Sequence, residues 1–166
     1  DAPWPLEELY LHGSDLSAAA AGPALAALSR HAGLRRLGVR CCKLSPATFK
    51  VLVEAALPAL SFLDAAGAAV AFDGPHSLGA AAFAGFPALE ELDLRWVPLG
   101  EAGAALLASR RWARLRELNL RDAELGDTGV VALARGEWPA LEELYLSENN
   151  SSADAAGPAL AALSRH

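Results

Sequence analysis

The sequence has few of the residues that build catalytic and metal centres. Its 166 residues include two cysteines, four histidines and no methionine. No histidine stands three or four residues from another or beside the cysteines, so the ligand spacing of a zinc site is absent. The GxSxG, HExxH and glycine-rich phosphate-loop motifs are also missing. We therefore expect no enzyme activity, no cofactor and no metal.

Positive charge and long apolar runs are scarce as well. The 14 Lys and Arg residues are outnumbered by 20 Asp and Glu residues, which gives a formal charge of −6. Unspecific binding to nucleic acid needs clustered Lys and Arg against phosphates, so we expect no nucleic-acid partner. Although 53% of the residues are hydrophobic, no uninterrupted apolar run approaches the roughly 18 residues that a membrane-spanning helix needs. We expect no membrane partner either.

The two cysteines are neighbours in the sequence, at Cys41 and Cys42. Adjacent strand residues point to opposite faces, so these two are poorly placed to bond to each other. We expect two reduced thiols, with Cys42 buried and Cys41 more exposed, which favours an intracellular location. We expect no signal peptide, and we expect a chain that starts at Asp1 without methionine to be a trimmed or excised segment.

A short leucine pattern recurs six times along the chain. Its copies read LEELYL, LRRLGV, LSFLDA, LEELDL, LRELNL and LEELYL, and they begin at Leu6, Leu34, Leu60, Leu89, Leu115 and Leu141. Self-similarity at this period indicates a stacked array of repeats. Alternate residues of a strand share one face, and a single short strand cannot bury its apolar face alone. The pattern therefore predicts six parallel strands lying side by side in register.

A stretch with helical character follows most copies of the pattern. In residues 126–136, apolar residues recur at helical spacing, Asp127 suits the start of a helix and Gly136 can close it. Residues 100–109 are similarly rich in Ala and Leu. Since successive parallel strands are usually joined by a crossover helix, each unit is predicted to run strand, turn, helix, turn.

Residues 115–134, LRELNLRDAELGDTGVVALA, resemble a leucine-rich repeat of the ribonuclease-inhibitor-like subtype, and residues 89–108 are similar. The resemblance extends from Leu6 to His166, so we take residues 1–166 as one domain. It implies an α/β right-handed solenoid, a horseshoe segment of six strand–helix units with the parallel sheet on the concave face and the helices on the convex face. It also implies a non-enzymatic scaffold that binds a protein partner on the concave face.

Two features depart from the family pattern. The family usually has Asn or Cys at the ninth position of the repeat, where a side chain can satisfy the turn backbone, and here only Cys42 and Asn149 conform. In the third unit, residues 60–88, Ala65 stands where a larger apolar residue is expected. We expect an irregular turn and lower stability in that unit.

Positions three, five and seven of each unit are predicted to point outward from the concave face. Equivalent residues should lie about 4.8 Å apart, so the position-three glutamates of the last three units should form a row of like charge. Nearby arginines (Arg95, Arg116 and Arg121) neutralise this row in one interpretation; in the other, it receives a basic or aromatic partner surface. The candidate partner-binding residues are Glu91, Asp93, Arg95, Trp96, Glu117, Asn119, Arg121, Glu143, Tyr145 and Tyr10.

Trp96 is the best single candidate for a contact, because it is a large aromatic residue at an exposed strand end. The alternative is that Trp96 packs against Pro98 and the turn of the next unit. The other three tryptophans, Trp4, Trp112 and Trp138, are predicted to pack between helices and strands.

The two ends of the chain are nearly copies of each other. Residues 6–31 and 141–166 agree at 20 of 26 positions, and the last 12 residues of the two segments are identical. This copy suggests a second class of function, a structural or engineered building block whose terminal unit serves capping or head-to-tail assembly and which has no ligand. Ser151, which replaces an apolar residue of the pattern, suits a partial cap; if capping is incomplete, unit six should stack on unit one of another copy.

Overall fold

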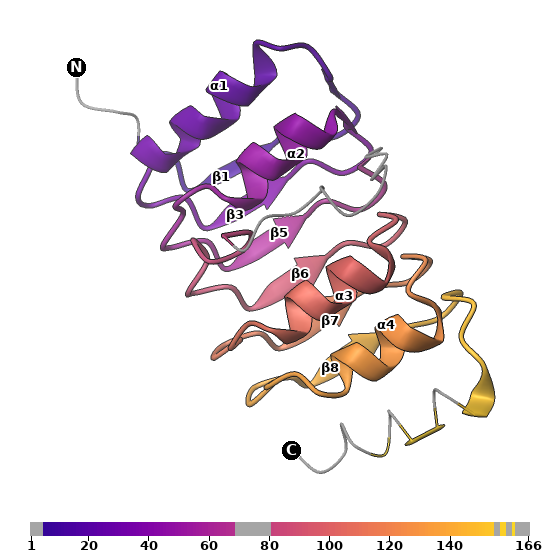
Figure 1. Cartoon of the computed structure of the whole chain (residues 1–166). Helices are drawn as coiled ribbons and strands as arrows, with labels where there is room; N and C mark the ends of the chain where they lie inside the picture. Colours follow the sequence, from indigo (N-terminus) through magenta and orange to yellow (C-terminus); the bar gives the residue numbers. More distant parts are fainter. Residues whose placement is uncertain (1–4, 69–80, 155–156, 159–160, 162–166) are drawn as a thin grey trace.

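Six short strands form one parallel sheet in the computed structural model, which describes residues 5–68, 81–154, 157–158 and 161 (Figure 1). Their order is β1-β3-β5-β6-β7-β8. The strands are β1 (Glu8–Tyr10), β3 (Arg36–Gly38), β5 (Phe62–Asp64), β6 (Glu91–Asp93), β7 (Glu117–Asn119) and β8 (Glu143–Tyr145). Each begins two residues after the first leucine of its unit, so the predicted parallel sheet is confirmed.

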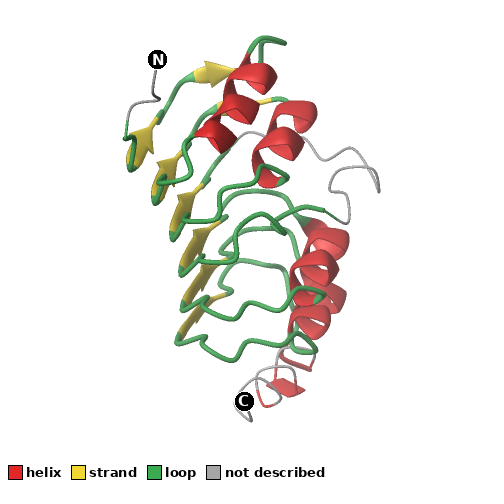
Figure 2. Ribbon diagram, turned by 90° about the vertical axis from the view of Figure 1, so that its left-hand side faces the viewer, coloured by secondary structure: helices red, strands yellow, loops and turns green. Residues whose placement is uncertain are grey.

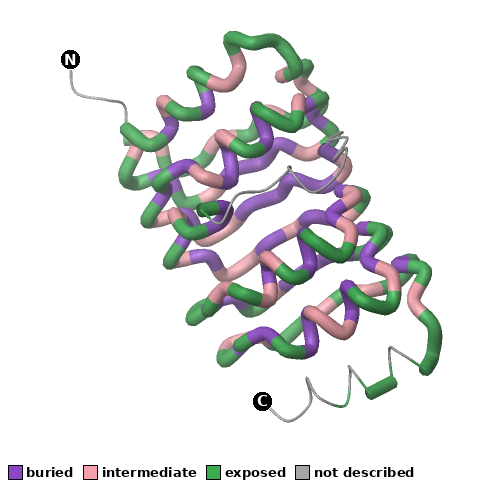
Figure 3. Tube along the Cα trace, viewed as in Figure 1, coloured by how far each residue is buried: buried purple, intermediate pink, exposed green. Residues whose placement is uncertain are grey.

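The strands pair in the register that the repeat predicts. The middle leucines Leu9, Leu37, Leu63, Leu92, Leu118 and Leu144 stand opposite one another along the sheet. The four in the central strands are at most 1% exposed, whereas Leu9 and Leu144 at the two edges are only partly buried. Figure 3 shows the same gradient, with buried residues gathered in the middle units. Each unit therefore owes its core to the neighbours on both sides.

The helices lie on the opposite side of the molecule from the large sheet, as Figure 2 shows. They are α1 (Ala21–Ala26), continued by the 3₁₀ helix η1 (Ala27–Arg30), α2 (Pro46–Val53), α3 (Gly100–Ala108) and α4 (Gly126–Leu133). A second, two-stranded parallel sheet joins β2 (Asp15–Leu16) to β4 (Lys43–Leu44). The architecture is thus mixed α/β with strands and helices in separate layers.

Helix α4 begins close to the predicted position but ends differently. It stops at Leu133 with Ala134 in right-handed geometry, so the prediction that Gly136 closes it was wrong. A Cβ at Gly136 would lie 2.6 Å from Trp138 Nε1, so glycine is needed there for the close approach of the ring. Asp127 does not cap its own helix; it accepts hydrogen bonds from Ser152 N (2.6 Å) and Ser152 Oγ (3.0 Å) of the next unit.

Trp112 and Trp138 are buried, as predicted, and stack on each other. Their ring centroids are 6.4 Å apart and their planes differ by 7°. Each indole N–H donates to a carbonyl at the end of the preceding helix, Leu107 O for Trp112 and Leu133 O for Trp138, both at 2.9 Å. These bonds satisfy the N–H groups of the two buried indoles. The same carbonyls also accept backbone N–H groups, from Arg110 (3.2 Å) and Gly136 (3.0 Å). Trp4 lies outside the described residues.

The third unit is described only in part, because residues 69–80 lie outside the described ranges. Ala65 is fully buried, and residues 81–85 form turns in which Phe83 adopts a φ of 62°. The expected irregular connection therefore falls mostly on residues that the structure does not describe.

The two ninth-position residues that match the family pattern both bind turn backbone. Cys42 is fully buried and its thiol donates to Leu11 O (2.9 Å), while Cys41 is exposed, as predicted. Asn149 is 2% exposed. Its Oδ1 accepts from Ala123 N (2.9 Å) and Leu125 N (3.2 Å), and its Nδ2 donates to Leu120 O (2.6 Å) and to Leu146 O (2.9 Å). One side chain thereby joins unit five to unit six.

Asn149→Ala should lower the free energy of unfolding by about 2 kcal/mol, because it leaves several buried backbone groups without partners. Asn119→Ala is the matched control, since the Asn119 amide oxygen accepts only one backbone N–H, that of Arg121 (3.2 Å). Asn119→Ala should lower the free energy of unfolding by about 1 kcal/mol or less. Urea unfolding followed by circular dichroism measures both values. Equal losses for the two variants would contradict the special role of Asn149.

Candidate functional site

The outward side of the large sheet, called here the strand face, carries three columns of side chains. They are Glu8, Arg36, Phe62, Glu91, Glu117 and Glu143 at position three; Tyr10, Gly38, Asp64, Asp93, Asn119 and Tyr145 at position five; and His12, Arg40, Ala66, Arg95, Arg121 and Ser147 at position seven. The strand pairing places Glu117 directly between Glu91 and Glu143. The predicted row of like charge, the acidic row, is therefore present.

Electrostatics in the acidic row work against ionisation of its central member. Burial raises the pKa of Glu117 above its ordinary value, and the neighbouring charges of Glu91 and Glu143 raise this pKa further. The positive charge of Arg95 opposes this rise. Like charges directly opposite each other on adjacent strands destabilise a sheet. The row is thus a local cost to the fold that a cationic partner could remove.

The arginines expected to neutralise the acidic row have other partners in the described structure. Arg95 Nη2 lies 2.6 Å from Asp93 Oδ2. Arg116 Nη1 pairs with Glu142 Oε1 at 2.9 Å, and Arg121 Nε donates to Ser147 Oγ at 2.7 Å. The charge of Arg95 nevertheless lowers the pKa of Glu117, so the charge-lattice interpretation holds in part for this arginine.

In the central units, the side chains at position five form hydrogen bonds with the backbone. The side-chain oxygens of Asp64, Asp93 and Asn119 accept the backbone N–H two residues further on, at 3.0, 3.1 and 3.2 Å. Burial raises the pKa of Asp93, and the Arg95 bonds oppose that rise. Asn119 is only 9% exposed. Asp93 and Asn119 thus hold the strand ends in place, and Asn119 offers little surface to a partner.

The exposed large hydrophobic side chains of the described chain all belong to the strand face or its edge. They are Tyr10 (46%), Trp96 (44%) and Tyr145 (38%). Tyr145 stands at the end of the acidic row, where its hydroxyl donates to Glu143. This hydrogen bond raises the pKa of the Tyr145 phenol. Aromatic residues beside charged groups are typical of the central contacts of protein interfaces.

Trp96 contacts the units before it. Its ring lies 5.7 Å from the Arg40 guanidinium and 5.4 Å from that of Arg95, and a Cβ at Gly67 would be 3.5 Å from its Cε3. The backbone N–H of Trp96 also donates to Arg121 O of the following unit (2.9 Å). With a φ of 61° the residue ends β6 in left-handed geometry and keeps much of its ring exposed.

Tyr10 belongs to a separate cluster at the other end of the sheet. Its hydroxyl accepts from Arg36 Nε (3.0 Å) and donates to Glu8 Oε2 (3.2 Å), and the Arg36 guanidinium lies 3.9 Å above the Phe62 ring. Two strands, β3 and β5, separate Tyr10 from β6, where the acidic row starts. The sequence analysis grouped Tyr10 with the acidic row and missed Arg36 and Phe62, although both stand in the position-three column.

No group of three or more His, Cys, Asp or Glu residues in the described ranges is arranged to hold a metal ion. Within the same part of the chain, none of the helices has the length and apolar character needed to cross a membrane.

Residues 115–134, which make up most of the fifth unit, match the family model described as leucine rich repeat. The match supports a leucine-rich repeat family for this chain and agrees with its parallel six-stranded sheet and its layer of helices. No curated protein matches the sequence.

Glu117→Gln should raise the free energy of unfolding at pH 7 by about 0.5 kcal/mol, because it removes the central like charge of the acidic row. A carboxyl group whose pKa is raised by folding destabilises the folded state above that pKa, and the cost vanishes once both states are protonated. The gain should therefore disappear as the pH falls below the ordinary value of 4.5.

Glu142→Gln is the control for this experiment, because it removes the same charge but loses the Arg116 ion pair. Glu142→Gln should not raise the free energy of unfolding at any pH. Urea unfolding at several pH values tests both variants, and a Glu117→Gln gain that persists in acid would contradict the electrostatic cause.

Proposed function

We propose that this chain is a non-enzymatic, protein-binding scaffold whose partner docks on the strand face through a basic surface. The observation that supports this most is the coincidence of two features on one face. The exposed large aromatics of the described chain lie there, and so does the acidic row, whose arginine neighbours contact other groups. Repeats of the matched family commonly mediate protein–protein interaction, and the family is generally non-enzymatic.

A scaffold of this kind implies an overall geometry for the chain. We infer that residues 1–166 form one domain, a right-handed solenoid of the ribonuclease-inhibitor-like subtype with six strand–helix units. In such a solenoid the strand face would be concave and the helices convex. The two free cysteines, Cys41 and Cys42, favour a reducing, intracellular setting.

The proposed contact surface consists of the acidic row and its rim. Glu91, Glu117 and Glu143 would receive Lys or Arg side chains of the partner. Trp96 and Tyr145 would supply large, stiff contact area at either end of the row. The position-seven residues Arg95 and Arg121 border the row and would discriminate against a partner of uniform positive charge. Tyr10, with Arg36 and Phe62, would form a second contact at the other end of the face.

The triple variant Glu91→Lys, Glu117→Lys, Glu143→Lys tests this proposal. Peptides selected from a random library on the wild-type chain should be rich in Lys and Arg beside aromatic residues. Their affinity for the triple variant should fall at least ten-fold, because each cation then meets a like charge.

The matched control is Glu101→Lys, Glu124→Lys, Glu137→Lys, which changes the net charge equally at exposed positions outside the strand face. It should bind the selected peptides nearly as well as the wild-type chain. Equal loss in both triple variants, or peptides without basic residues, would contradict docking on the acidic row. Melting curves of all three proteins check that folding is retained.

The second candidate function is a building block that assembles head to tail without a ligand. The incomplete burial of the leucines in the two end units favours it. Their leucines, Leu6, Leu9, Leu11, Leu141, Leu144 and Leu146, are only partly buried, whereas their counterparts in the inner units are at most 1% exposed. A further unit stacked on either end would cover them, and the near identity of units one and six makes a second copy of this chain a suitable source.

Light scattering over a wide concentration range tests the assembly. The mean mass should rise with concentration, and Leu144→Arg should abolish the rise, because it places a charge where the next unit would stack. The control is Leu106→Arg, a partly buried leucine of helix α3 away from both ends. A monomer mass at every concentration would rule out this candidate.

A further inference from the structure

A cluster of arginines stands out just before the fifth strand of the large sheet. The segment RRWARLR, residues 110–116, holds four of the 14 Lys and Arg residues of a chain whose formal charge is −6. It forms the connection between helix α3 and strand β7, on the edge of the molecule where the strands begin. Positive charge is therefore concentrated at one place outside the strand face.

These arginines do not recur in the neighbouring connections, although Arg30 holds the position of Arg111 before the second unit. The positions equivalent to Arg110, Arg111 and Arg114 hold Gly136, Glu137 and Ala140 in the next connection, and Ala84, Gly85 and Ala88 in the preceding one. What does recur at the centre of the three connections is the buried aromatic residue: Phe86, Trp112 and Trp138. Stacking of these three units thus uses the aromatic residue but not the arginines.

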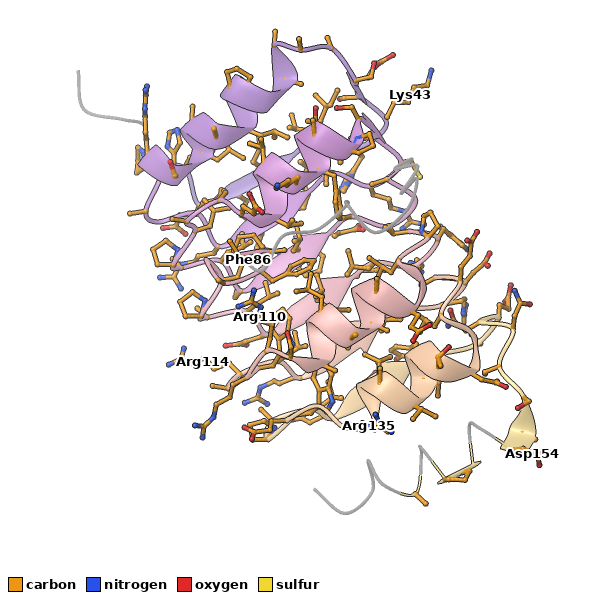
Figure 4. All side chains as sticks on the ribbon, in the orientation of Figure 1. Lys43, Phe86, Arg110, Arg114, Arg135 and Asp154 are labelled. Atoms are coloured by element: carbon orange, nitrogen blue, oxygen red, sulfur yellow. The ribbon has the colours of Figure 1, made fainter. Side chains whose placement is uncertain are left out.

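The arginines border a cavity of about 260 Å³, called here the arginine pocket. Its apolar lining includes the buried side chains of Phe83, Phe86, Leu89 and Trp112, and its charged lining is Arg110, Arg111 and Arg114. Figure 4 shows Phe86, Arg110 and Arg114 along the same edge of the molecule. A small apolar floor is thus combined with a larger cationic rim.

Much of this positive charge has no counterpart within the described residues. Arg110 Nε is shielded from solvent and has no hydrogen-bond partner there. Arg114 is exposed and has no ion-pair partner in the same part of the chain. Arg111 Nε is 3.9 Å from Glu137 Oε2, and both side chains are largely exposed, so this pair is weak. The charges of these guanidinium groups are therefore largely unpaired within the described residues, which leaves them available to an anion.

We propose that the arginine pocket binds a carboxylate carried on an aromatic group. The planar guanidinium fork matches the two oxygens of a carboxylate, and the apolar floor would take the ring. The volume suits a group of side-chain size rather than a large cofactor. The same chemistry occurs in a free aromatic acid and in the C-terminal residue of a protein. This site lies apart from the strand face and does not depend on the function proposed above.

N-acetylphenylalanine, titrated into the full chain by calorimetry, is the direct probe. A ligand of this size should bind with a dissociation constant of about 1 mM. N-acetylphenylalanine amide has the same ring without the charge and should bind at least ten-fold more weakly. Arg110→Gln should weaken binding of the acid at least ten-fold. Arg135→Gln should leave it unchanged, because Arg135 is exposed in the following connection and does not line the pocket.

Arg114→Gln is the second variant, because Arg114 is exposed and its replacement should not disturb folding. It too should weaken binding of the acid, whatever the fate of Arg110→Gln. A longer peptide ending in phenylalanine, with a free or an amidated C-terminus, distinguishes a protein C-terminus from a free aromatic acid as the natural ligand. Tighter binding of the free peptide than of N-acetylphenylalanine identifies a protein C-terminus, and equal binding identifies a small aromatic acid. The proposal is overturned if acid and amide bind equally, if Arg114→Gln binds like the wild type, or if no binding is detected.

Discussion

Parallel pairing of equivalent residues in neighbouring strands is the constraint on which the rest of this structure depends. A strand of three residues cannot bury its leucine, so each unit is stable only between two others. The consequence is visible in the leucines themselves: Leu37, Leu63, Leu92 and Leu118 are buried in the inner strands, and Leu9 and Leu144 are partly exposed at the edges. Cooperation between neighbours, rather than a separate core in each unit, holds the chain together.

The same register also creates the electrostatic character of the strand face. Whatever a unit carries at position three is brought opposite its counterparts, so three glutamates that are 26 residues apart in sequence become neighbours. Burial raises the pKa of Glu117, and the repulsion from Glu91 and Glu143 raises it further. A row of like charge that the fold offsets only in part, through Arg95, is a feature that a binding function would explain, whereas stability alone would select against it.

Recurrence separates structural features from candidate functional ones in this chain. The stacked aromatics at the beginnings of the strands recur, and they donate to helix-end carbonyls through Trp112 and Trp138. The side-chain oxygens at position five recur as well, and they hold the strand ends. Features that occur in only one part of the array, such as the acidic row and the arginines around residue 110, have no such role in stacking.

The period and the alternation of leucines were enough to predict the strands, their direction and their register, because these follow from short-range geometry repeated along the chain. The burial of Cys42 was predicted from its place at the ninth position of the family pattern. The same reasoning could not predict which groups the long, flexible side chains contact. Several acceptors lie within reach of the three arginines Arg95, Arg116 and Arg121, and each pairs with one of them. The contacts of Trp96 depend on the left-handed backbone at the end of its strand. Only the tertiary structure decided these partners, the bonds of Asn149 to the fifth unit and the cavity beside Arg110, since each requires atoms from separate units to meet at a definite distance.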